Sequence, residues 1–129
     1  MIQGIGVDLI EIQRIQSSID EFGETFLRKI FTDIEIAYCR SRKNPAQHFA
    51  ARFAAKEAVS KALATGWSGE VEWKNVEVTN ELSGKPNVVL HGKTAEALKK
   101  SRVHLSLSHS ESAVAAFAII EVDDSPQIV

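Results

Sequence analysis

Residues 46–65 form the longest uninterrupted helical pattern in the chain, and they limit the possible folds more than any other segment. The stretch is rich in alanine and has no glycine or proline in its interior that would weaken a helix. Asn44-Pro45 marks a turn before the pattern, and Gly66 is typical of the position just past a helix end. We therefore predict one long helix, against which the remaining elements pack.

The segments before this helix predict one strand and three shorter helices. Residues 2–8 alternate as a strand does, and two glycines there leave room beside Asp8 for another backbone or a ligand. Thr32 and Glu35 have the spacing of a capping box at a helix start. Apolar spacings of three and four predict helices over residues 11–20, 22–31 and 33–42.

The second half of the chain predicts mainly strands. The alternation changes phase between Trp73 and Val76, which indicates a bulge or a break. Residues 103–109 alternate, residues 113–122 are nearly all apolar, and the short turn between them predicts a hairpin. Further patterns predict strand-like alternation at 71–73 and at 76–78, a turn at 83–86, a strand over 87–90 and a helix over about 93–100. The whole pattern indicates a single α+β domain over residues 1–129, with a mainly antiparallel sheet packed against one long and several short helices.

Composition excludes several classes of protein. No apolar run approaches the ~20 residues of a membrane span, and the first residues lack the basic region of a signal peptide. One cysteine, Cys39, excludes an internal disulfide and a thiolate-rich metal cluster. A formal net charge of −2 argues against a general nucleic-acid binder. We expect a cytoplasmic protein without membrane or nucleic-acid partners.

Positive charge is concentrated between residues 28 and 61, where eight basic and three acidic residues give +5. Solvated helix faces would explain this excess. A positive field for an acidic partner or a phosphorylated ligand would explain it equally well.

Asp8, Glu57 and Lys61 are candidate functional residues. Glu57 and Lys61 lie four apart and share a helix face, where they would form a stabilising ion pair or border a site. Asp8 at a strand end is a turn or capping residue, or a metal ligand. Mg²⁺ takes one or two protein carboxylates together with substrate phosphates, so Asp8 and Glu57 would suit it if the fold brings them together.

Polar residues at 106–110 end the penultimate strand. A serine nucleophile is disfavoured because no G-x-S-x-G elbow is present and because Ser108 and His109 point to opposite faces of a strand. Polar packing, or binding of a phosphate or base, fits this cluster better. The Gly84-Lys85 turn lacks the spacing of a P-loop.

Three motifs resemble those of the phosphopantetheinyl transferases that act on the fatty-acid carrier protein. They are GIGVDLIE at residues 4–11, FAARFAAKEAVSKA at residues 49–62 and SLSHS at residues 106–110. The turn GKP at residues 84–86 also matches the family. Order, spacing and total length are similar to the short bacterial type, so the resemblance covers essentially the whole chain.

The resemblance implies transfer of the 4′-phosphopantetheine arm of coenzyme A to a serine of apo-acyl carrier protein, with release of adenosine 3′,5′-bisphosphate, in fatty acid biosynthesis. It implies that Asp8 and Glu57 hold Mg²⁺ and that Lys61 contacts phosphate, so that all three are catalytic. A metal-bound water or a carboxylate such as Glu57 would take the proton of the attacking serine. The resemblance also implies that coenzyme A lies against Gly84, Lys85, Pro86, Ser108, His109 and Ser110.

The family resemblance also gives the charge excess a meaning. An acidic carrier protein would dock on the first helix, where Arg14 and Arg28, with Arg40 or Arg42, would form a basic face. The resemblance implies a homotrimer with active sites between subunits, and the apolar strand at 113–120 suits such a core.

Two other functions share parts of the pattern. A Mg²⁺-dependent hydrolase of a nucleotide pyrophosphate would use the same carboxylates with water as the acceptor. A non-catalytic adaptor would bind an acidic protein through the basic face and would need neither Asp8 nor Glu57. Release of adenosine 3′,5′-bisphosphate that depends on the acceptor protein separates the transferase from the hydrolase. The adaptor predicts that Asp8→Ala and Glu57→Ala leave partner binding and function unchanged.

Overall fold

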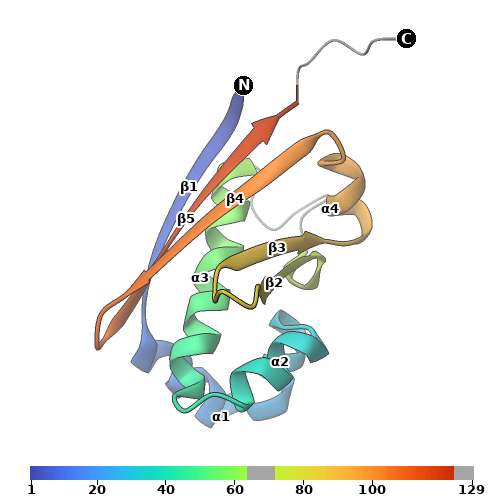
Figure 1. Ribbon diagram of the computed structural model, residues 1–129. Helices are drawn as coiled ribbons and strands as arrows, with labels where there is room; N and C mark the ends of the chain where they lie inside the picture. The colour runs from blue at the N-terminus through green and yellow to red at the C-terminus, as the bar shows by residue number, and fades with distance from the viewer. Residues whose placement is uncertain (64–71, 124–129) are drawn as a thin grey trace.

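The computed structural model describes residues 1–63 and 72–123 (Figure 1). Its mixture of helices and antiparallel strands confirms the predicted α+β class. The predicted helix stop at Gly66 and the alternation at Val71 lie outside the described residues. In chain order the elements are β1 (Ile2–Glu11), α1 (Ile12–Ile30), α2 (Asp33–Arg40), α3 (Pro45–Leu63), a short 3-10 helix (Trp73–Asn75), β2 (Val76–Asn80), β3 (Pro86–Leu90), α4 (Gly92–Ala97), β4 (Ser101–His109) and β5 (Ala113–Val122).

The main sheet has three antiparallel strands in the order β1-β5-β4. The β4–β5 pairing places His109 opposite Val114 and confirms the predicted hairpin. The first strand returns to the other edge of β5, so that Leu9 and Ser108 both lie opposite Ala115. Strands β2 and β3 form a separate two-stranded sheet. This topology brings the first and third sequence motifs to the two sides of one central strand.

Helix α3 lies across one face of the main sheet and also contacts α1, α2 and β2 (Figure 1). Its alanines allow close approach, and Ala58 has no exposed surface. Strand β1 passes so near that a Cβ on Gly6 would lie 1.9 Å from the carbonyl oxygen of Ala58. A Cβ on Gly4 would lie 1.8 Å from that of Ala62. The backbone of α3 therefore fills the space that the glycines leave, and the crossing places Asp8 beside this helix.

On the opposite face of the main sheet the β1 and β5 part is apolar and the exposed residues of β4 are polar, and no described element covers this face (Figure 1). Ile5, Val7 and Leu9 of β1 alternate with the residues that face α3, and they are 56%, 57% and 72% exposed. Phe117 on β5 lies opposite Val7 and is 41% exposed. A contiguous apolar sheet face of this kind is typical of an association surface.

Several element boundaries differ from the prediction. The two helices predicted over 11–20 and 22–31 are both present as the two parts of α1, but the kink between them lies at Gly23, whose φ of 55° is non-helical. Trp73 belongs to a 3-10 helix and not to a strand. The break predicted before Val76 is the point where this 3-10 helix ends and β2 begins. Helix α4 covers Gly92–Ala97 and is shorter than predicted. None of the helices that the structure describes is long and apolar enough to cross a membrane.

Candidate active site

Asp8 and Lys61 form an ion pair where β1 crosses α3. The Lys61 ammonium lies 3.0 Å from Asp8 Oδ1 and also donates to the carbonyl oxygen of Val7 at 3.1 Å. The Asp8 side chain is 15% exposed and that of Lys61 is 52% exposed. Glu57 lies one turn before Lys61 on the same face of α3. The fold therefore brings the strand end to the helix, which was the condition for a site that uses Asp8 together with residues of α3.

The helix-stabilising pair between Glu57 and Lys61 is not formed. Lys61 is bound to β1, and within residues 1–63 and 72–123 the carboxylate of Glu57 has no hydrogen bond or ion pair. Asp8 and Glu57 thus supply two oxygen ligands of the hard type that Mg²⁺ prefers. No group of three or more metal-binding side chains occurs in the described part of the chain. Two carboxylates suit a Mg²⁺ ion that keeps waters and binds phosphate, and they do not suit a closed structural site.

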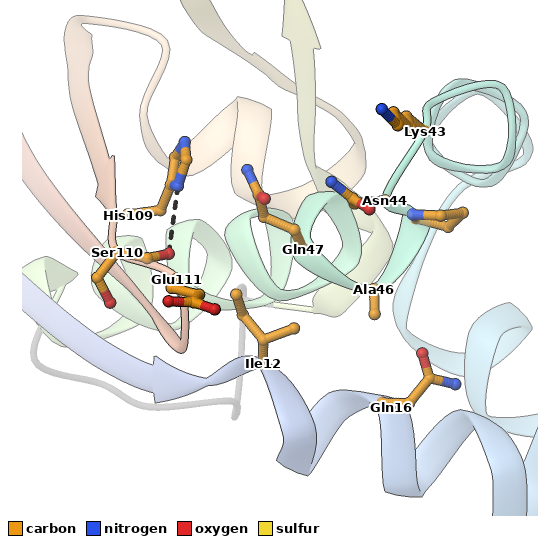
Figure 2. Close-up of a pocket in the computed structure, with 10 residues that line it drawn as sticks. Ile12, Gln16, Lys43, Asn44, Ala46, Gln47, His109, Ser110 and Glu111 are labelled. Carbon is orange, nitrogen blue, oxygen red and sulfur yellow. Dashed lines mark hydrogen bonds between the residues drawn. The ribbon is translucent and has the colours of Figure 1, made fainter.

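The tip of the β4–β5 hairpin borders a second feature, a hollow of about 690 Å³ (Figure 2). His109 and Ser110 line it from the hairpin, while Lys43 and Asn44 line it from the loop that precedes α3. Figure 2 shows Gln47, from the first turn of α3, lying between His109 and Asn44. His109 is exposed, and its Nδ1 lies 3.3 Å from the carbonyl oxygen of Ser110. Ser108 lines a smaller neighbouring hollow together with Leu9.

Positive groups gather at this end of α3. Burial lowers the pKa of His48, and the nearby cations Arg42 and Arg52, together with His109, lower it further. Lys43 adds an exposed ammonium on the hollow itself. Glu111, at the hairpin tip, adds an exposed carboxylate to the same lining. The hollow therefore offers an anionic ligand a positive charge at Lys43, opposed by the negative charge of Glu111.

The sequence did not single out Lys43, Asn44 or Gln47 as site residues. Lys43 was counted only within the basic stretch, and Asn44 only as a turn residue. Their meeting with His109 depends on the packing of the hairpin against the start of α3, about 65 residues earlier in the chain. The excess of positive charge was the one signal that could have found them.

Asp8 and His109 lie on the same side of the main sheet, whereas Ser108 points to the opposite side. Asp8 lies opposite Ala116 and His109 lies opposite Val114, on the two strands that flank β5. Two strand spacings across the sheet and two residues along it separate their Cα atoms by about 12 Å. A ligand with a pyrophosphate and a nucleoside is long enough to contact both groups.

The turn at residues 84–86 leads into β3, a strand that contacts β4. Gly84 and Lys85 are exposed, Pro86 begins β3, and none of them lines the hollows at the hairpin tip. The turn is joined to α3 through Asn80, which donates to the carbonyl oxygen of Gly84 at 3.0 Å and accepts from Arg52 at 2.8 Å.

The predicted basic face is weaker than the charge count indicates. Arg28 lies 3.3 Å from Glu24 and 3.4 Å from Asp33, and Arg40 is paired with Glu24. In contrast, the exposed side chain of Arg14 has no partner among the residues that the structure describes, and it borders a hollow at the start of α1. Arg14 therefore presents the less compensated positive charge on α1.

Comparison with known proteins agrees with this arrangement. The family model of the 4′-phosphopantetheinyl transferase superfamily matches residues 4–118. A holo-[acyl-carrier-protein] synthase of Koribacter versatilis is 48% identical over 124 residues, which cover 94% of this chain and 99% of that protein. The crystal structure of the synthase from Neisseria meningitidis matches with a TM-score of 0.88 and 36% identity, covering 94% of this chain and 99% of the other.

A second solved structure contains a ligand. The holo-(acyl-carrier-protein) synthase of Bacillus anthracis, in complex with CoA (3′,5′-ADP), matches with a TM-score of 0.82 and 37% identity, over 95% of this chain and 99% of that one. The family model spans all three motifs, the relatives match over nearly their full length, and the chain belongs to the 4′-phosphopantetheinyl transferase superfamily.

Proposed function

We propose that this protein transfers the 4′-phosphopantetheine group of coenzyme A to a serine hydroxyl of an apo-acyl carrier protein, in fatty acid biosynthesis in the cytoplasm. The serine hydroxyl gives up its proton, to a water or to a carboxylate such as Glu57, and its oxygen attacks the phosphorus that carries the pantetheine arm. The bond from this phosphorus to the bridging oxygen breaks, and adenosine 3′,5′-bisphosphate leaves. The crossing of β1 and α3 that joins Asp8 to Lys61 beside Glu57 carries the proposal.

Lys61 is the residue best placed to stabilise charge. Phosphoryl transfer needs mainly positioning and neutralisation of negative charge, with little covalent work by the protein. Two acceptors, Val7 O and Asp8 Oδ1, hold the Lys61 ammonium in one position while its side chain stays half exposed. A fixed ammonium of this kind stabilises charge that develops on the pyrophosphate during the reaction.

Asp8 and Glu57 are the residues that would hold Mg²⁺. When bound, the ion would neutralise and orient the pyrophosphate. Asp8 is oriented by its ion pair with Lys61, which engages Oδ1. Glu57 has no competing partner among the described residues, so its carboxylate is available as a ligand. These two side chains are well placed to act together because the glycine-mediated crossing fixes β1 against α3.

The nucleotide end of coenzyme A would occupy the hollow beside His109 and the turn at residues 84–86. Ser108, His109 and Ser110 supply polar groups from the hairpin, and Lys43 supplies a positive charge for a phosphate. Gly84, Lys85 and Pro86 would contact the adenosine or its phosphate from the β2–β3 turn.

The acidic carrier protein would dock on α1. Arg14 is exposed next to Glu11, which lies three residues from Asp8 on β1, so a carrier bound there would reach the reacting groups. Arg28 would contribute at the other end of α1, with its charge reduced by Glu24 and Asp33.

The apolar outer face of the main sheet is proposed to join three copies of this chain. Ile5, Val7, Leu9 and Phe117 would lose their exposure in such an assembly. Analytical ultracentrifugation measures this directly, with a trimer expected. Leu9→Lys would shift the protein to smaller species, and a wild-type monomer at micromolar concentration would contradict the assembly.

The intact mass of an apo-acyl carrier protein tests the proposed reaction. The carrier is incubated with this protein, coenzyme A and Mg²⁺, with and without EDTA. A metal-dependent gain of one phosphopantetheine group is expected. Coenzyme A cleaved without a gain in carrier mass would indicate a hydrolase instead. Intact coenzyme A and an unchanged carrier would contradict the transferase and favour an adaptor.

A further inference from the structure

Arg52 is a buried cation on α3 whose role is not explained by the groups described above. Arg52 is only 2% exposed, and its guanidinium carbon lies 4.2 Å from the centre of the Tyr38 ring. Nη2 donates to Asn80 Oδ1 at 2.8 Å. Nε has no partner within the described residues. Burying a guanidinium costs free energy unless its N–H groups find hydrogen-bond acceptors. The bond to Asn80 therefore offsets part of this cost.

The bond from Arg52 determines which way the Asn80 amide points. A guanidinium can only donate hydrogen bonds, so the oxygen of the amide must face Arg52. The NH₂ group then faces the other way, where Nδ2 donates to the carbonyl oxygen of Gly84 at 3.0 Å. Arg52, Asn80 and Gly84 therefore form a directional chain from the buried side of α3 to the exposed turn.

The other described hydrogen bonds of the turn at residues 81–85 all lie within its own hairpin. Its backbone bonds join Glu81 to Gly84 and to Lys85, and the side chains of Ser83 and Asn87 bond within the same hairpin. In the part of the chain that the structure describes, the turn makes no hydrogen bond with an element outside the hairpin. The Asn80 amide is thus the link through which α3 acts on the position of the turn.

We propose that Arg52 and Asn80 are positioning residues that hold the 81–85 turn in the conformation that receives coenzyme A. The inference rests on the proposed function, in which Gly84, Lys85 and Pro86 contact the nucleotide end. Neither Arg52 nor Asn80 needs to touch the substrate. Because the turn would contact the nucleotide equally before and during the reaction, loosening it weakens substrate binding and leaves the chemical step nearly unchanged.

The test compares two substitutions at one position. Asn80→Ala removes both hydrogen bonds without adding charge. Asn80→Asp keeps an acceptor for Arg52 but replaces the donor to Gly84 by an oxygen. Steady-state kinetics give kcat and the KM values for coenzyme A and for the carrier, and titration calorimetry gives the Kd for coenzyme A. Lys93→Gln, at an exposed position on α4, is the control that matches the charge change of Asn80→Asp.

Both Asn80 variants are expected to raise the KM and the Kd for coenzyme A about fivefold or more, the loss that corresponds to one net hydrogen bond. The kcat and the KM for the carrier should change less than about twofold, as should all values for Lys93→Gln. An effect of Asn80→Asp without one of Asn80→Ala would indicate charge repulsion and would overturn the inference. Unchanged coenzyme A binding in both would overturn it too. A wild-type protein that does not modify the carrier would instead overturn the proposed function.

Discussion

The Lys56 ammonium lies 2.9 Å from the Glu35 carboxylate, and neither side chain has any exposed surface. Lys56 also donates to the carbonyl oxygens of Trp73 and Val76, at 2.8 and 2.5 Å. Glu35 accepts from the backbone N–H groups of Thr32 and Val78. One buried pair therefore joins α2, α3 and the segment that leads into β2, next to the catalytic candidate Glu57.

Lys56→Met is expected to destabilise the fold by about 3–5 kcal/mol, because Glu35 would remain as an uncompensated buried charge. Urea unfolding followed by circular dichroism measures the loss. Lys99→Met is the matched control, since Lys99 pairs with Glu96 on the surface and such a pair contributes only about 0–1 kcal/mol. Equal losses in the two variants would contradict the assigned role of the buried pair.

Gly6→Ala is expected to prevent the crossing of β1 and α3. The added Cβ would lie 1.9 Å from the carbonyl oxygen of Ala58, a backbone atom that cannot rotate away. We expect a loss of about 3 kcal/mol or more in the free energy of unfolding, at or above the usual range for overpacking. Gln3→Ala, at an exposed polar position of the same strand, is the control for the effect of alanine in β1. A Gly6→Ala variant as stable as Gln3→Ala would show that the strand has room to move.

Glu77 makes the stability of the fold depend on pH in the acidic range. Burial acts to raise its pKa, but hydrogen bonds from Thr32 and His91 prevail and hold it below the usual 4.5. A carboxylate with a lowered pKa adds stability at higher pH, and that stability is lost as the pH falls through the folded-state pKa. Below about pH 4.5 the wild type should therefore lose more stability than Glu77→Gln. Unfolding curves between pH 7 and 3 measure the difference, and parallel pH profiles would contradict it.

Cys39 should not react in the folded protein. Burial raises the pKa of its thiol to about 12, and the side chain has no exposed surface. Only the thiolate is nucleophilic, so a disulfide reagent such as DTNB should label the thiol in urea but not in buffer. Rapid labelling of the native protein would show that the core around Cys39 opens readily.

Local patterns predicted the helices and the hairpin well, because residues close together in the sequence largely determine these elements. The Thr32–Glu35 capping box is present with both of its bonds, and the hairpin of β4 and β5 has the predicted faces. The glycine-containing strand correctly pointed to a close neighbour of Asp8. In each case the deciding interaction lies within a few residues or follows a strict alternation.

The count of charges could not tell exposed cations from buried ones, because tertiary contacts determine which are buried. Arg52 and Lys56 were counted in a positive surface stretch, yet both are buried. Lys56 is satisfied by carbonyl oxygens about 20 residues later in the chain, and Arg52 by Asn80, which no local pattern signals. For the same reason the sequence could not place Lys43 beside His109.

Arg14 and Arg28 lie on the same helix, and we expect them to contribute unequally to docking of the carrier protein. Arg14 has no described partner, whereas Arg28 is bound by Glu24 and Asp33. Charge steers the encounter with an acidic protein, and a charge already compensated contributes less to it. Arg14→Glu should therefore reduce kcat/KM for the carrier by roughly five- to tenfold, and Arg28→Glu should reduce it less. Kinetics at 50 and 300 mM salt test the cause, because screening should slow the wild type more than Arg14→Glu. Equal effects of the two substitutions, or a rate that does not depend on salt, would place the docking face elsewhere on the molecule.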